Sequence, residues 1–84
     1  MNQNEILTIL IEELGNVAPE LSATDIADIS ADADLREALD IDSISLLNFI
    51  IALHKRLKVE IPEIDYPKLV TKKGALDYLL ARLQ

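Results

Sequence analysis

Apolar residues recur at three- and four-residue steps in two long stretches of the chain, which is the pattern of an amphipathic helix. In the first stretch the apolar positions are Ile6, Leu7, Leu10, Ile11 and Leu14. This spacing predicts a helix over residues 4–14. Asn2 or Asn4 is expected to cap its start, and Gly15 is expected to follow its end.

The second stretch predicts a helix that begins at Asp42 or Ser43 and ends near Leu57, with either residue as its N-terminal cap. It carries two apolar stripes. The wider one has the spacing of a core-facing side and consists of Leu46, Phe49, Ile50, Leu53 and Leu57. The second consists of Ile44, Leu47 and Ile51 and continues into His54, Lys55 and Lys58. Because this stripe ends in charged residues, we expect it to face outward and to form a docking surface.

The remaining segments are shorter or less regular. Residues 15–42 hold a proline and scattered Ser and Asp residues, so we expect a long loop with one helical turn at 35–39. Residues 63–69 predict a short turn or helix, and residues 71–83 predict a last helix whose first turn Gly74 weakens by about 1 kcal/mol. The predicted fold is all-α, a small four-helix bundle of three main helices and one short one, with a long loop between the first two.

Length and charge narrow the class of protein. The 84 residues, taken as one domain over 1–84, carry a net charge of −7 and no cysteine. Residues 1–42 hold eleven acidic residues and one basic residue, whereas residues 43–84 hold four acidic and seven basic ones. The acidic half argues against nucleic acid as a ligand. No apolar run is long enough to span a bilayer and the N-terminus does not resemble a signal peptide, so we expect a cytoplasmic monomer that does not insert into membranes.

Several kinds of catalytic or metal site are excluded by spacing. The single histidine, His54, lies three helical turns or roughly 16 Å along the axis from Ser43, too far to activate its hydroxyl. The Asp-rich run 28–34 resembles a calcium loop, but Ala33 stands where glycine is required and Leu39 where the bidentate glutamate is required. We therefore expect no metal site and no enzyme activity, and favour a binding or carrier protein.

Ser43 is the candidate that remains. A hydroxyl in the first turn of a helix is exposed, and a phosphodiester attached there lies near unpaired backbone N–H groups and the positive end of the helix dipole. The neighbouring Asp42 adds negative charge that can assist a divalent metal or a basic residue of a modifying enzyme.

The stretch from Asp34 to Ile44 resembles the attachment region of acyl carrier proteins, whose hallmark is Asp-Ser-Leu; Ile44 here replaces the leucine. The segments Ile61-Pro62-Glu63 and Thr71 to Leu79 also resemble that family. The resemblance implies that a phosphopantetheinyl transferase moves 4'-phosphopantetheine from coenzyme A to Ser43, with magnesium. The thiol of this arm would then carry an acyl group as a thioester for acyl-loading, condensing or acyl-transferring enzymes.

Besides Ile44, the chain departs from the family pattern at two further places. Asp40 stands where glycine is common. The helix from Ser43 to Leu57 has no acidic residue, although family members usually present several there to basic partner surfaces. We therefore expect a dedicated set of partners in a specialised fatty-acid, lipid or polyketide-type pathway. Its recognition surface would consist of Ile44, Leu47, Asn48, Ile51 and Lys55.

Two alternatives remain open at this point. One is an aminoacyl or peptidyl carrier of a nonribosomal pathway. The other is a carrier-like interaction subunit in which Ser43 only caps a helix and is never modified.

Overall fold

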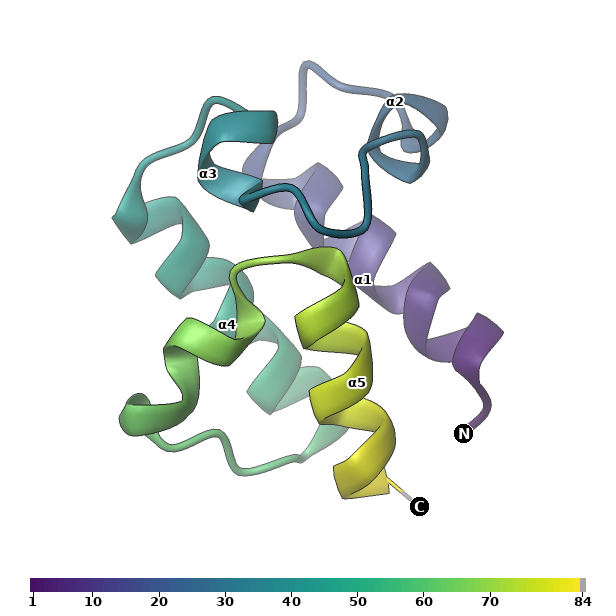
Figure 1. Cartoon of the computed structure of the whole chain (residues 1–84), viewed down its shortest axis with the longest axis vertical. Coiled ribbons are helices and arrows are strands. Elements are labelled where there is room, and N and C mark those ends of the chain that lie inside the picture. Colours follow the sequence, from purple (N-terminus) through teal and green to yellow (C-terminus); the bar gives the residue numbers. More distant parts are fainter. Residues whose placement is uncertain (84) are drawn as a thin grey trace.

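A computed structural model describes residues 1–83, in which all regular structure is helical. Figure 1 shows the helices as one compact body, with α1 running beside α5 on the right of the view. In chain order the elements are α1 (Gln3–Val17), α2 (Ala23–Ala27), α3 (Leu35–Ala38), α4 (Ser43–Leu57), the 3-10 helix η1 (Glu63–Leu69) and α5 (Lys72–Leu83). The predicted all-α class is confirmed, and α1, α4, η1 and α5 correspond to the four predicted helices.

Polar side chains cap the three main helices. The Asn2 side chain accepts a hydrogen bond from the Glu5 N–H at 2.9 Å, and the Glu5 carboxylate accepts one from the Asn2 N–H. The Asp42 carboxylate accepts the Ser45 N–H at 2.8 Å, which makes Asp42, not Ser43, the cap of α4. At the start of α5 the Thr71 hydroxyl accepts the Gly74 N–H at 2.9 Å.

Two expectations for the first half of the chain are wrong. The first helix does not end at Gly15 but continues to Val17, where the Ala18 N–H donates to the Leu14 carbonyl. The segment expected to be a loop also contains the helix α2. Its cap, Ser22, exchanges side-chain and backbone hydrogen bonds with Asp25. A helix of five residues is too short to show a period in the sequence, although its capping pattern is visible there.

Gly74 also has a different role from the one expected. A side chain at this position would overlap the backbone carbonyl oxygen of Lys68. Glycine therefore allows the first turn of α5 to lie directly against the end of η1. Glycine weakens the helix at this position, but only a residue without a side chain allows α5 and η1 to pack this closely.

The core is aliphatic around one phenylalanine. Phe49, Leu10, Leu14, Leu53 and Leu79 are fully buried. α1 lies against α4, α5 and α2 and so forms the centre of the packing. At the polar edge between α1 and α4, Arg56 donates to Glu13 at 3.1 Å and to Glu12 at 3.2 Å, so a cation offsets two carboxylates near the negative end of α1.

Candidate functional site

Ser43 is the first residue of α4 and is exposed to solvent. Because the Asp42 carboxylate binds the Ser45 N–H, the cap position is already filled. This hydrogen bond is the main cause of the lowered pKa of Asp42. Among residues 1–83 the Ser43 side chain has no hydrogen-bond partner. Its hydroxyl is therefore accessible and not needed for helix capping.

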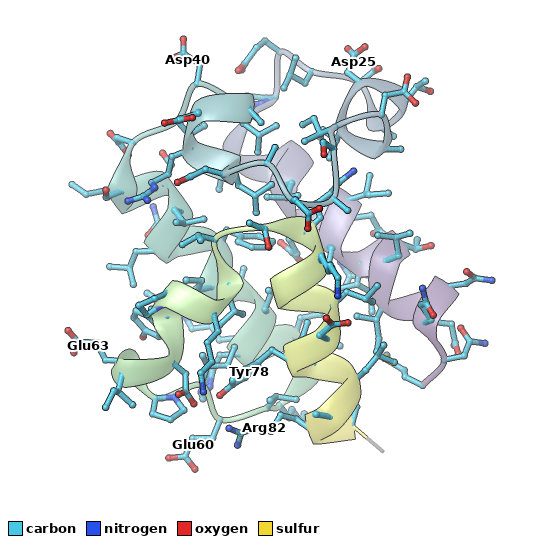
Figure 2. The ribbon with its side chains drawn as sticks, in the orientation of Figure 1. Asp25, Asp40, Glu60, Glu63, Tyr78 and Arg82 are labelled. Atoms are coloured by element: carbon cyan, nitrogen blue, oxygen red, sulfur yellow. The ribbon has the colours of Figure 1, made fainter. Side chains whose placement is uncertain are left out.

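A tight turn between α3 and α4 places Ser43. The Ile41 N–H donates to the Arg36 carbonyl at 3.0 Å, and Asp40 adopts a left-handed conformation with φ of 53°. This is the conformation that glycine adopts most readily, which explains the departure noted at this position. Figure 2 shows the Asp40 side chain pointing away from the body of the protein. Aspartate is among the few residues besides glycine that tolerate this left-handed conformation.

A pocket of about 250 Å³ lies beside Ser43, between α3, α4 and η1. Besides Ser43 its wall consists of Arg36, Leu46, Leu47, Ile50, Tyr66, Pro67 and Val70. The wall is mostly apolar, and its one charged residue is positive. These features fit a 4'-phosphopantetheine group, which has an anionic phosphodiester at the serine and a longer, less polar arm beyond it. The contributions of Arg36 and Tyr66 to this pocket were not predicted from the sequence.

The second stripe of α4 faces outward, as predicted. Ile44 is 69% exposed, and Leu47 and Ile51 are each 37% exposed. Asn48 and Lys55 are also exposed on α4. The predicted recognition residues are thus brought together on a single helix whose first residue is Ser43.

His54 lies in the last turn of α4, whereas Ser43 begins that helix. It lines a separate pocket of about 140 Å³ with Ile50, Ile51, Ile61 and Tyr66. Within the described part of the chain, no three His, Cys, Asp or Glu side chains are grouped as they would be to hold a metal ion. The helices of residues 1–83 include none with the length and apolarity needed to cross a membrane.

Comparison with known proteins gives one consistent family. The family model for the phosphopantetheine attachment site matches residues 4–69. The acyl carrier protein of Thermosynechococcus vestitus is 32% identical over 79 residues, which are 94% of this chain and 93% of that protein.

Two further relatives extend the range of organisms and names. The acyl carrier protein of Rubrobacter xylanophilus is 28% identical over 80 residues, covering 95% of this chain and 94% of that protein. The polyketide-8 synthase acyl carrier protein 2 of Streptomyces avermitilis is 28% identical over 72 residues, covering 86% of this chain and 83% of that protein. The exposed serine, the pocket beside it and these matches agree, and the chain belongs to the phosphopantetheine-attachment family of acyl carrier proteins, whose cofactor is covalently attached 4'-phosphopantetheine.

Proposed function

We propose that Ser43 is the attachment point of the phosphopantetheine arm and that residues 1–84 work as one carrier domain, a substrate of its partner enzymes. The observation that carries this proposal is the exposed Ser43 hydroxyl without a hydrogen-bond partner, next to a mostly apolar pocket. Asp42 supports the site by capping α4, which leaves the serine free. The arm would supply a thiol that carries an acyl group as a thioester.

The first test is loading of the purified chain. It is incubated with coenzyme A, magnesium and a broad-specificity phosphopantetheinyl transferase, and the intact mass is measured. We expect the wild type to gain one phosphopantetheine group and Ser43→Ala to gain none. A helical circular-dichroism spectrum for both proteins is the control for folding. An unchanged wild-type mass with this and with the transferase of the native host would refute the proposal and favour an unmodified interaction subunit.

The outward stripe of α4 is the surface we propose for partner enzymes. Ile44, Leu47 and Ile51 form an exposed apolar strip that begins next to the attachment point, with Asn48 and Lys55 beside it. Single exposed apolar residues are ordinary on a protein surface, but three in line with a reactive position indicate a contact surface. The enzymes that would use it are the phosphopantetheinyl transferase and the acyl-handling enzymes.

Adding a negative charge to the stripe tests whether partner enzymes bind this surface. Leu47→Glu and Ile51→Glu are expected to lower kcat/KM of the transferase, because they place a carboxylate in an apolar contact. Thr8→Glu is the matched control, since it adds the same charge to an exposed position on α1. Loss of activity for all three variants alike would point to a general effect of charge and not to docking on α4.

The absence of acidic residues on α4 supports a specialised pathway. Between Ser43 and Leu57 this helix carries only neutral and basic side chains, so partners that rely on a basic surface gain little there. The relative named polyketide-8 synthase acyl carrier protein 2 supports a polyketide-type pathway, whereas the name acyl carrier protein of another relative specifies no pathway. Ser45→Glu and Asn48→Glu are expected not to improve acyl transfer by the native loading enzyme, and a clear improvement would argue for a generic partner.

A further inference from the structure

Arg36 is the only basic residue among the first 42 residues, which also contain eleven acidic ones. Its guanidinium binds Asp34 through two contacts, from Nε to Oδ1 at 3.2 Å and from Nη2 to Oδ2 at 2.9 Å. The remaining terminal nitrogen, Nη1, takes part in no hydrogen bond within residues 1–83. The guanidinium is therefore oriented by one carboxylate while it keeps donors available for a second anion.

The backbone holds Arg36 close to the attachment point. The Arg36 carbonyl accepts the Ile41 N–H at 3.0 Å, which closes the turn two residues before Ser43. Arg36 and Ser43 line the same pocket of about 250 Å³. Arg36 and Ser43 therefore border a shared space, although they come from different helices.

A phosphodiester on Ser43 adds a negative charge to a strongly acidic region. Asp42 precedes the serine directly, and Asp40 lies in the turn before it. A guanidinium can compensate this charge because its planar donors match two phosphate oxygens. Among the residues that line the pocket, Arg36 is the only cation.

We propose that Arg36 is a positioning residue that binds the phosphodiester of the arm and directs the arm into the pocket between α3, α4 and η1. The guanidinium then bridges Asp34 and the phosphate, with Asp34 fixing its orientation. The inference rests on attachment at Ser43, which the loading experiment tests separately. No bond is formed or broken in this step, since it is an ionic contact within the loaded protein.

Nuclear magnetic resonance of the loaded protein tests the inference without any enzyme assay. The ³¹P shift of the phosphodiester is recorded for wild type, Arg36→Gln, Arg36→Lys and Arg82→Gln between low and high salt. Arg82 is the matched control, because it has a similar exposure of 45% against 43% and also pairs with an aspartate. The side-chain ¹⁵N signals of Arg36 and Arg82 are compared before and after loading of the wild type.

We expect loading to shift the Arg36 signal and not the Arg82 signal. The ³¹P shift of Arg36→Gln should differ from wild type at low salt, and Arg36→Lys should lie between them. Arg82→Gln should match wild type. High salt is expected to move the wild-type value toward that of Arg36→Gln, because exposed ionic contacts are screened.

The inference is overturned if folded Arg36→Gln and wild type give the same ³¹P shift, or if the Arg36 signal of the wild type does not respond to loading. The second measurement uses only wild-type protein, so it decides the matter even if a variant misfolds. Failure of the proposed attachment would look different, because the intact mass would then show no arm on Ser43.

Discussion

Among residues 1–83 Lys72 is the one buried cation, and its replacement by methionine is expected to destabilise the protein by about 2 kcal/mol. The residue is 7% exposed, and its Nζ donates to the carbonyls of Ile26 at 3.1 Å and Ala27 at 3.0 Å. These carbonyls lie at the end of α2, so the lysine ties that helix to the start of α5. Methionine has a similar length and keeps the apolar contacts of the side chain, but it cannot donate.

The magnitude follows from what the two carbonyls lose. The Ile26 carbonyl keeps the Ile29 N–H at 3.2 Å, whereas the Ala27 carbonyl has no other donor within residues 1–83. A hydrogen bond from a charged group contributes about 1.5–3 kcal/mol. Ala27 is exposed, so water can reach its carbonyl after the change, and the loss is that of the charged hydrogen bonds. The gain from burying a methionine in place of an ammonium group offsets part of this loss. A net loss of about 2 kcal/mol corresponds to a fall in Tm of about 8–16 °C for a domain of this size.

The neighbouring Lys73 provides the control. Its side chain is 61% exposed and pairs with Asp77 one turn further along α5, an arrangement that stabilises by only about 0.3–0.5 kcal/mol. Urea unfolding followed by circular dichroism compares wild type, Lys72→Met and Lys73→Met. If the two variants lie within 0.5 kcal/mol of each other, the buried lysine does not hold α2 as described, and the reasoning fails.

Three further predictions concern single positions. Lys58→Gly is expected to stabilise by about 0.5–1 kcal/mol in urea unfolding, because Lys58 ends α4 with φ of 55° and glycine relieves that strain. Gly74→Ala is expected to lower Tm, because the new methyl group meets the Lys68 carbonyl; a rise in Tm would show that helix propensity dominates there. The Tyr78 hydroxyl donates to Asp65 at 2.7 Å. This bond lowers the pKa of Asp65, while burial and the same bond raise the pKa of Tyr78. Stability from this pair is thus lost as pH falls below the usual 3.8 of aspartate and as pH rises through the raised pKa of the tyrosine above 10.0. Tyr78→Phe should flatten both limbs of a Tm-against-pH curve.

The helices that could be predicted from the sequence are those long enough to repeat an apolar pattern. α4 shows both of its faces in this way, since Phe49 is fully buried and Ile44 is exposed. α2 has a single buried residue, Ile26, and therefore no period. Its position depends on a lysine 46 residues further along the chain, a long-range contact that local pattern does not reveal.

One part of the candidate site could likewise be predicted from local sequence, and another part could not. The exposure of Ser43 at the start of α4 and the outward stripe beginning at Ile44 follow from local sequence. The pocket does not, because Arg36 comes from α3 and Tyr66 from η1, whereas Ser43 begins α4. The sequence nevertheless contains one indication of this role. Arg36 is the one basic residue in the acidic first half of the chain, and such a residue is a candidate for binding an anion.

The separation of charge along the chain also has a consequence in space. Residues 20–42, with eight acidic side chains and one basic one, include α2 and α3, which lie at one end of the long axis in Figure 1. That axis measures 31 Å, several times the screening length of about 8 Å at physiological ionic strength. An approaching enzyme therefore interacts with the local charge of the end that it meets. The net charge of −7 is the local charge of neither end. The separated charges make the protein an electric dipole, and the electric field of a partner enzyme orients this dipole before contact. The association rate therefore depends on salt even when the partner has zero net charge.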